Sequence, residues 1–395
     1  MLRTGETARQ GLRDENRATP ELVGARGKGG DVVKTSMKDE SGIMKRTEKT
    51  MLAGVTAAAL LIVMGIARSV QAQGEPFYKG KNVRIIVGAS AGGFYDRWAR
   101  LLARFIPRYL PGNPSMIVQT MPGAGSLVAT NYVYGIAKPD GLTLLMPNSN
   151  TYLEQLSGHK EVRFDLRKMA IIGSQEKNFM LLYMRADAPY KTISDIVNAK
   201  EPPKCGSSGV SSAGYVLDRV LEIALNAKIS TVMGYPGGNE IDLAVEKGEI
   251  HCRGNTINPH FGREPFDSWH KKGFDRHLVQ SGKKRDPLVP EAPTIYELMD
   301  QAKTPETNRR VARVLLDGAE FGRWMLVTPG TPPDRIKMLR AAYAQAIKDP
   351  ELVAEAKKSR MDMDPSSGED LQKLLNELLD QPKEVVERAK KVLTE

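Results

Sequence analysis

The sequence predicts an α/β fold in two lobes, each lobe a doubly wound sheet with flanking helices. Residues 83–87 form an apolar, β-branched run that leads through a loop of small residues into a helical pattern. The same order of strand, small-residue loop and helix begins again at residues 204–213. In parallel α/β sheets, ligands gather at the loops that follow the strands. We therefore expect a ligand cleft between two lobes.

The strand at residues 83–87 is followed by the loop Gly88–Gly93 and by a helix whose apolar residues recur at helical spacing. Residues without bulk let the backbone come close to a ligand, and the start of a helix directs unpaired N–H groups and a positive dipole end at it. The loop therefore predicts a cradle for an anion, a carboxylate or a phosphate. Asp96, in the first turn of the helix, either contacts a ligand amine or hydroxyl or complements the helix dipole.

The remaining elements follow from the alternation of apolar runs, small-residue loops and helical patterns. The first block continues with strand 116–121, loop 122–126, helix 127–137, strand 142–146 ending at residues 147–151, strands 170–174 and 179–184, and a helix over 193–199. The second block contains strand 204–206, loop 207–212, helix 213–226, strand 229–233, loop 234–238, a helix to residue 247 and strand 249–253. Residues 258–284 are less regular, and a strand at 324–327 with helices at 334–347, 350–359 and 368–392 closes the chain.

The N-terminal region predicts export. Residues 1–43 are polar and lack periodicity, so we expect them to be disordered or a non-native extension. Residues 44–72 have the basic start, apolar segment and small-residue cleavage site, near Ala72, of a secretory signal peptide. The alternative is a membrane anchor, but the apolar run of about 16 residues is shorter than the ~20 that a span needs. The mature protein should then be soluble and periplasmic.

The charge balance is mildly basic, with 57 Lys and Arg against 47 Asp and Glu and a net charge of +10. No dense basic stripe or RNA-binding aromatic motif is present, so we expect no nucleic-acid partner. A positive balance suits an anionic small ligand. Neither G-x-G-x-x-G nor G-x-x-x-x-G-K-[ST] occurs, and we expect no cofactor.

The two cysteines, Cys205 and Cys252, predict a disulfide, because an exported chain meets an oxidising compartment. Two buried thiols are the alternative. If the second block has the common 2-1-3 strand order, the two cysteine strands are parallel neighbours about 4.8 Å apart, with both cysteines near their carboxyl ends. A metal site from His251, Cys252, Cys205 and His260 matches no standard zinc spacing. We therefore expect a disulfide with surface histidines, and no metal.

An enzymatic alternative lies in the first loop. Gly88–Gly92 fits G-x-S-x-G between a strand and a helix, which would make Ser90 the nucleophile of a serine hydrolase. That elbow normally follows several strands and is served by a histidine late in the chain, whereas here it follows the first strand and the last histidine is His277. We therefore expect a protein that is not an enzyme.

With these elements in place, the chain resembles the Bug-type extracytoplasmic receptors of tripartite tricarboxylate transporters. The family patterns V-P-F-x-A-G-G-x-x-D-x-x-A-R, P-G-A-G-G, P-D-G-Y-T-L-L, G-S-P-G-x-G, Y-K-G-G, L-P-x-V-P-T-x-x-E and W-x-x-x-x-P-x-G-T-P are similar, in order, to residues 87–100, 122–126, 139–145, 206–211, 235–238, 289–297 and 324–332. The chain departs from the family at Gly88, at Ser90, at Phe94-Tyr95 and at Asn255, which stands where the family has an aspartate.

The resemblance implies a two-lobed periplasmic binding protein, type II-like, that closes by a hinge on a small carboxylate, either a di- or tricarboxylate or an aromatic acid. Lobe 1 would comprise residues 73–178 and 280–395, and lobe 2 residues 179–279. The implied ligand-binding residues are Ala89, Ser90, Ala91, Gly92, Gly93, Tyr95, Asp96, Gly125, Ser126, Ser149 and Asn150 on lobe 1, and Ser207, Ser208, Ser211, Tyr235 and Asn255 on lobe 2. The implied partners are membrane permease subunits, with the receptor a monomer; a solute sensor for a signalling protein is the alternative.

Overall fold

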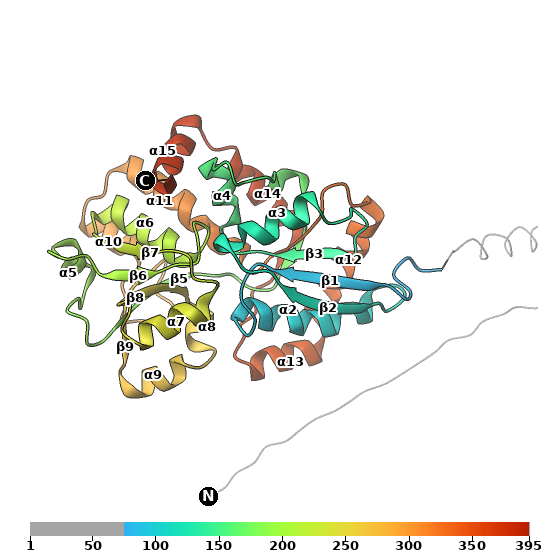
Figure 1. Cartoon of the computed structure of the whole chain (residues 1–395), viewed down its shortest axis with the longest axis horizontal. Coiled ribbons are helices and arrows are strands. Elements are labelled where there is room, and N and C mark those ends of the chain that lie inside the picture. The colour runs from blue at the N-terminus through green and yellow to red at the C-terminus, as the bar shows by residue number, and fades with distance from the viewer. Residues whose placement is uncertain (1–74, 395) are drawn as a thin grey trace, which may run out of the picture. The chain divides into compact units, whose positions relative to one another are not determined.

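The computed structural model describes residues 75–394, which belong to the unit Gly74–Glu395 (Figure 1). The expectations for residues 1–43 and for the signal peptide at 44–72 lie outside the described residues. Within residues 75–394, no helix is long and apolar enough to cross a membrane.

The first sheet has six strands in the order β11-β4-β10-β3-β1-β2. Its strands are β1 (Asn82–Val87), β2 (Ser115–Thr120), β3 (Thr143–Met146), β4 (Ala170–Ser174), β10 (Met325–Val327) and β11 (Ser366–Ser367). β1 pairs in parallel with β2 and β3, whereas β10 is antiparallel to both β3 and β4. The loops that follow β1 and β3 therefore meet at one edge of the sheet.

The second sheet has five strands in the order β7-β6-β8-β5-β9. Its strands are β5 (Met180–Arg185), β6 (Lys204–Gly206), β7 (Ser230–Val232), β8 (Cys252–Thr256) and β9 (Asp275–Gln280). β6 is parallel to β7 and β8, which confirms the 2-1-3 order, and β5 is antiparallel to β8 and β9. The α/β fold with two lobes is confirmed, and both sheets are mixed because each includes antiparallel strands.

Helices flank both sheets, as Figure 1 shows. They are α2 (Phe94–Phe105), α3 (Leu127–Gly135), α4 (Thr151–Ser157), α5 (Ile193–Val197), α6 (Ala213–Leu225), α7 (Gly238–Glu246), α8 (Ile257–Phe261), α9 (Phe266–Lys272), α10 (Ile295–Gln301), α11 (Glu306–Leu316), α12 (Pro333–Ala346), α13 (Pro350–Lys358), α14 (Gly368–Leu379) and α15 (Lys383–Thr394). Short 3-10 helices lie at Ile106–Tyr109, Ala124–Ser126, Leu166–Lys168 and Asp317–Phe321. The region that looked irregular in sequence, 258–284, contains α8, α9 and β9.

The core follows from the alternation of side chains along β1. Val83, Ile85 and Val87 are buried in one apolar cluster with Trp98 and Leu102 of α2. Ile86 points to the opposite face and joins a second cluster that includes residues of α3 and of the second sheet. A strand buried on both faces accounts for the continuous apolar run in the sequence.

The chain crosses between the sheets after β4 and again after β9. The lobe boundaries at residues 178 and 280 stay a prediction, although β5 to β9 form the whole second sheet. After β9, α10 and α11 pack against α6, and the Thr304 hydroxyl donates a hydrogen bond to the Ala224 carbonyl at 2.7 Å. Part of the C-terminal third of the chain therefore contacts the second sheet's helical layer.

A disulfide joins Cys205 to Cys252, which are paired opposite each other on β6 and β8. One detail of the sequence argument was wrong: Cys252 is the first residue of β8, because that strand runs over Cys252–Thr256 and not over 249–253. The bridge therefore lies at the amino end of β8, and the carboxyl end of that strand is left for the residues around Asn255.

Candidate functional site

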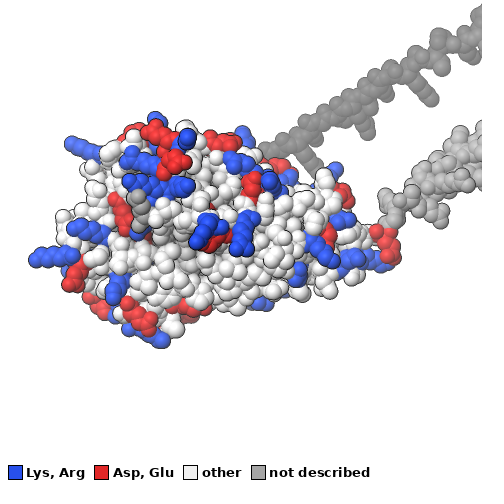
Figure 2. Space-filling model, turned by 45° about the horizontal axis from the view of Figure 1, so that its top comes forward, with Lys and Arg blue, Asp and Glu red and all other residues white. Residues whose placement is uncertain are grey.

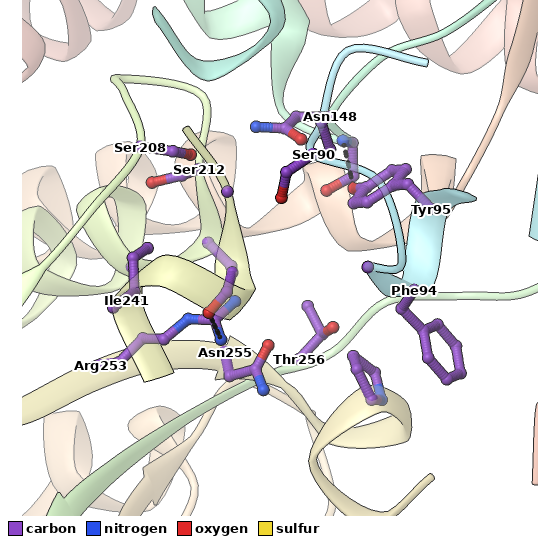
Figure 3. Close-up of a pocket in the computed structure, with 18 of the residues that line it drawn as sticks. Ser90, Phe94, Tyr95, Asn148, Ser208, Ser212, Ile241, Arg253, Asn255 and Thr256 are labelled. Carbon is purple, nitrogen blue, oxygen red and sulfur yellow. Dashed lines mark hydrogen bonds between the residues drawn. The ribbon is translucent and has the colours of Figure 1, made fainter. Parts of the chain in front are cut away.

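A cavity of about 90 Å³ lies between the two sheets (Figure 3). The first lobe contributes the loop after β1, the start of α2 and the loop after β3. The second lobe contributes the loops after β6 and β7 and the end of β8. Its polar lining residues are Ser90, Tyr95, Asn148, Ser149, Asn178, Ser208, Ser211, Ser212, Arg253, Asn255, Thr256, Arg263 and Arg323.

The loop after β1 is held in place by Asp96. The Asp96 Oδ2 atom accepts hydrogen bonds from the Gly92 amide at 2.8 Å and from Arg100 Nε at 2.9 Å. Gly92 has a φ of +76°, a conformation that favours glycine. Asp96 is buried and does not line the cavity, so its role is to hold the backbone of the loop in position.

Ser126 connects three loops at the edge of the first sheet. Its hydroxyl donates to the Gly88 carbonyl at 2.9 Å and accepts from the Asn148 amide at 3.0 Å. Gly88 is required there, since a Cβ on it would lie 2.4 Å from Ser126 Oγ. Ser126 thus fixes the positions of the loops that carry Ser90 and Ser149.

The two lobes touch on both sides of the cavity. Ser90 Oγ donates to Glu240 Oε2 at 3.1 Å, and Asn239 Nδ2 donates to the Ala91 carbonyl at 3.3 Å. On the other side, the Ser211 hydroxyl donates to the Gly125 carbonyl. Residues 237–240 therefore face the loop after β1, and the loop after β6 faces Gly125.

Two arginines line the second-lobe wall and share one carboxylate. The guanidinium groups of Arg253 and Arg263 both contact Asp242, which is 2% exposed and also accepts a hydrogen bond from Tyr183 at 2.7 Å. Burial alone would raise the pKa of Asp242, but the two guanidinium groups hold it below its usual value. Asp242 is therefore ionised at neutral pH, and two guanidinium groups beside one carboxylate leave one positive charge in excess.

Arg323 occupies the junction of the two lobes. It is 1% exposed, it pairs with Glu176, and its guanidinium lies 4.6 Å from the ring centre of Phe94. Its terminal nitrogens donate to Asn178 Oδ1 at 3.2 Å and to Thr256 Oγ1 at 3.4 Å. Burial lowers the pKa of Arg323 to about 10, so the group stays cationic at neutral pH.

Several buried donors in the cavity wall have no acceptor among the described residues. They are the Nε atoms of Arg253, Arg263 and Arg323 and the Nδ2 atom of Asn255. Buried polar groups are normally hydrogen-bonded, and an unpartnered one costs about 1–3 kcal/mol. Three guanidinium groups and one amide facing a small cavity make a site for an anion that accepts several hydrogen bonds.

The structure brings about half of the predicted site residues to the cavity. Those that line it are Ala89, Ser90, Gly93, Tyr95, Ser149, Ser208, Ser211 and Asn255. Those outside its lining are Ala91, Gly92, Asp96, Gly125, Ser126, Asn150, Ser207 and Tyr235. Several of the second group shape the loops, as Asp96 and Ser126 do.

The ligand-binding residues expected from the sequence did not include Arg253, Arg263, Arg323 or Asn178. Arg323 lies two residues before the buried strand β10, and Arg253 lies within β8. An arginine inside or beside an apolar strand could have indicated a site, because such a residue is expected to be buried. An arginine is rarely buried unless it has an anionic partner. For Ser90, the hydrogen bond observed is to the carboxylate of Glu240.

Two α/β lobes around a cavity with cationic donors are an arrangement suited to holding an anionic solute. The chain belongs to the family described as "Tripartite tricarboxylate transporter family receptor", which matches residues 99–390. A UPF0065 protein of Bordetella bronchiseptica is 22% identical over 308 residues, 77% of this chain and 84% of that protein. A UPF0065 protein of Agrobacterium vitis is 30% identical over 190 residues, 45% of this chain and 54% of that protein.

Solved structures share the fold. The periplasmic binding protein BugD superposes with a TM-score of 0.61 at 21% identity, covering 79% of this chain and 97% of that chain. MatC from Rhodopseudomonas palustris, with bound malate, has a TM-score of 0.61 at 20% identity, covering 79% of this chain and 98% of that chain. R. palustris Rpa4515, with adipate, has a TM-score of 0.60 at 18% identity, covering 79% and 95%. The family assignment confirms the resemblance seen in the sequence, and the family is one of solute receptors.

Proposed function

We propose that this protein captures a small carboxylate in the cavity between its lobes and delivers it to the permease subunits of a tripartite tricarboxylate-type transporter. The observation that carries the proposal is the set of unpartnered buried donors on Arg253, Arg263, Arg323 and Asn255. A carboxylate has about four lone-pair sites and can accept from a guanidinium in a bidentate manner. An uncharged ligand would leave the positive charge of the guanidinium groups unbalanced, and a cationic ligand would be repelled by it.

An aliphatic dicarboxylate fits best within this class. The cavity of about 90 Å³ is small, and cationic groups stand on two sides of it, Arg253 and Arg263 on the second lobe and Arg323 at the junction. The structural neighbours MatC and Rpa4515 were solved with malate and adipate, both dicarboxylates. One carboxylate would meet the second-lobe arginines, and the other would meet Arg323 and the amides of the loop after β1.

The proposal includes the exported, monomeric state. The signal peptide would be cleaved near Ala72, and the lobes would be residues 73–178 with 280–395 and residues 179–279. Ligand entry would require them to separate about the two crossing segments, since contacts such as Ser90 with Glu240 bridge the cavity wall. The lining residues named above would then contact the ligand, and the predicted residues outside the lining would position the loops.

A thermal-shift screen of the full chain tests this function. The compounds are malate, adipate, tricarboxylates, aromatic acids and, as a matched control, the uncharged diamide of each dicarboxylate. A ligand at ~100 times its Kd should add about 2.7 kcal/mol of stability. The expected result is a shift with one or more dicarboxylates and none with the diamides. Equal shifts with acids and diamides, or hydrolysis of ester analogues that Ser90→Ala abolishes, would overturn the proposal.

A further inference from the structure

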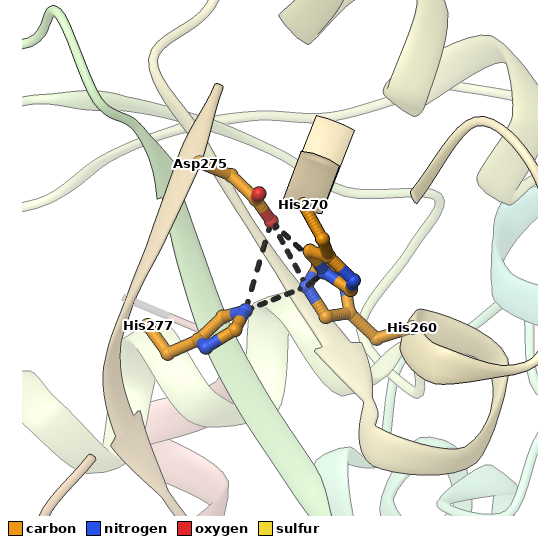
Figure 4. Close-up of side chains that lie close together, drawn as sticks. All are labelled: His260, His270, Asp275 and His277. Carbon is orange, nitrogen blue, oxygen red and sulfur yellow. Dashed lines mark hydrogen bonds and ion pairs between the residues drawn. The ribbon is translucent and has the colours of Figure 1, made fainter. Parts of the chain in front are cut away.

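Three of the five histidines of the chain meet one aspartate in the second lobe (Figure 4). His260 comes from α8, His270 from α9, and Asp275 and His277 from β9. Asp275 and His277 are two residues apart on a strand, so their side chains lie on the same face. One ligand-type atom from each of the four residues lies within 4.8 Å of every other.

The spacing of these four atoms matches a tetrahedral metal site. His260 Nε2 is 2.9 Å from His277 Nε2, 3.2 Å from His270 Nε2 and 3.0 Å from Asp275 Oδ2. Asp275 Oδ2 is 3.6 Å from His270 Nε2 and 3.7 Å from His277 Nε2. In a tetrahedron with metal–ligand bonds of about 2.0–2.1 Å, the ligands are separated by about 3.3 Å.

Hydrogen bonding among the four groups does not account for this convergence. A neutral imidazole nitrogen has either one proton or one lone pair, so His260 Nε2 can pair with only one of its three neighbours. The other two contacts then bring polar atoms together without a hydrogen bond. A cation at the centre would accept a lone pair from all four groups at once.

The surroundings act differently on the three imidazoles: they lower the pKa of His260 and His270, whereas for His277 the hydrogen bonds with Asp275 and Glu291 outweigh burial and raise the pKa. His260 is fully buried, stacked on Tyr183 with ring centres 4.8 Å apart, and burial lowers its pKa to about 4, which leaves it neutral at pH 7. Burial also lowers the pKa of His270. For Asp275, burial acts to raise the pKa, but the hydrogen bonds with His260 and His277 outweigh it and keep the carboxylate ionised.

A supporting carboxylate lies behind one ligand. His277 Nδ1 is 2.6 Å from Glu291 Oε1, so the nitrogen that faces away from the cluster has an acceptor. In metal sites, a carboxylate in this position fixes the tautomer in which Nε2 carries the lone pair. His277 is 11% and His270 25% exposed, which gives an ion a route to the buried atoms.

We propose that His260, His270, Asp275 and His277 bind a divalent transition-metal ion, with Zn²⁺ the best match to three imidazoles and one carboxylate. Four protein ligands in a tetrahedron leave no open position, which is the arrangement of a structural site. The proposal departs from the expectation that no metal is bound, and the burial of His260 corrects the expectation of surface histidines. Asp275, which the sequence analysis did not consider, completes the ligand set.

The ion would join α8, α9 and β9, three elements that are short or at a sheet edge. Pro259 and Arg263, which line the cavity, lie beside the ligand His260 in sequence. Cross-linking these elements would therefore steady the cavity wall. Metal binding to the folded chain would add stability that grows with the logarithm of the free metal concentration above the Kd.

The test uses the full chain produced without a polyhistidine tag. After treatment with a chelator and its removal, the protein is titrated with ZnCl₂ while heat is measured, and with CoCl₂ while visible absorption is recorded. We expect one ion per chain and, with cobalt, the intense absorption of tetrahedral coordination. His270→Ala, whose side chain is the most exposed of the four, should lower the affinity at least 100-fold, and His277→Ala should do likewise.

The matched control is His159→Ala, because His159 lies outside the cluster. It should bind zinc as the unchanged chain does. No binding by the unchanged chain, an octahedral cobalt spectrum, or equal affinities for His270→Ala and His159→Ala would each overturn the proposal. The cobalt spectrum needs no variant, so the test holds even if a substitution impairs folding.

Discussion

The backbones of Gly209 and Gly125 are in direct contact across the two lobes. A Cβ on Gly209 would lie 2.4 Å from the Gly125 amide nitrogen, which is closer than real Cβ atoms come. The obstacle is backbone, so it cannot be relieved by turning a side chain. The approach of the lobes seen here is therefore possible only because residue 209 has no side chain.

Gly209→Ala should weaken ligand binding by holding the lobes apart. We expect at least a ten-fold increase in Kd for the carboxylate found in the screen, which corresponds to about 1.4 kcal/mol. Titration calorimetry measures the effect. Gly135→Ala is the control, since a Cβ there meets nothing within 4 Å. Unchanged affinity in Gly209→Ala would mean that the lobes need not approach this closely to bind.

Asn255→Ala should also weaken binding, by removing an amide donor from the cavity. Asn255 is 3% exposed and its Nδ2 is one of the unpartnered donors in the cavity. A hydrogen bond to a charged group is worth about 1.5–3 kcal/mol, so we expect a loss of at least ten-fold in affinity. Asn198→Ala, at the exposed end of α5, makes the same truncation outside the cavity. If both variants bind as the unchanged chain does, Asn255 does not face the ligand.

Glu154 predicts a pH-dependent stability. It is 2% exposed, its Oε1 accepts a hydrogen bond from the Ser211 amide at 3.1 Å, and burial raises its pKa from 4.5 to about 7. The folded state binds the proton more tightly than the unfolded state, so stability is full below pH 4.5 and falls as the pH rises to 7. The unchanged chain should lose this contribution between pH 4 and pH 8, whereas Glu154→Gln should not. The free energy of unfolding of the variant minus that of the unchanged chain should therefore rise by about 3 kcal/mol from pH 4 to pH 8.

Urea denaturation of both chains at the two pH values measures this difference. Any effect of the substitution on packing is the same at both pH values, so it cancels when the two values are compared. Glu161→Gln is the control, because Glu161 is exposed and its substitution should have the same effect at both pH values. A Glu154→Gln effect that is equal at pH 4 and pH 8 would show that the carboxyl titrates normally.

Loss of the disulfide should destabilise the fold without removing the site. Cys205 and Cys252 are 47 residues apart in sequence, and the bridge restricts that loop in the unfolded chain. By the loop-entropy relation, replacing both with alanine should cost about 4 kcal/mol. Denaturant unfolding of the variant against the unchanged chain gives the value. A free energy of unfolding within 1 kcal/mol of the unchanged chain would show that the sheet, and not the bridge, sets stability there.

The sequence was sufficient to predict which loops form the site, but not which cationic side chains line it. Small-residue loops after β1 and β6 are local patterns, and each was placed from consecutive residues. Arg323 and Asp242 act through contacts with residues far along the chain, Arg323 with Thr256 and Asp242 with Arg253 and Tyr183. No local pattern distinguishes such a buried ionic group from a solvated one.

The histidine cluster was missed for a related reason. Nine residues separate His260 from His270, and one residue separates Asp275 from His277 on the same strand. This spacing follows no common metal motif. The cluster forms because α8 and α9 both pack beside β9 at the sheet edge, which depends on β9 pairing with β5. Because the irregular pattern of residues 258–284 did not predict β9, the proximity of the four residues could not be predicted from the sequence.

Asp242 has a consequence for how selective a receptor of this kind can be. Because it pairs with Arg253 and Arg263 within the second lobe, neither guanidinium depends on the ligand for its position, a saving of about 0.5–1.5 kcal/mol for each side chain. The two groups are pre-organised, and their separation is fixed. A rigid pair of this kind discriminates between acids by the direction of their carboxylates as well as by their charge.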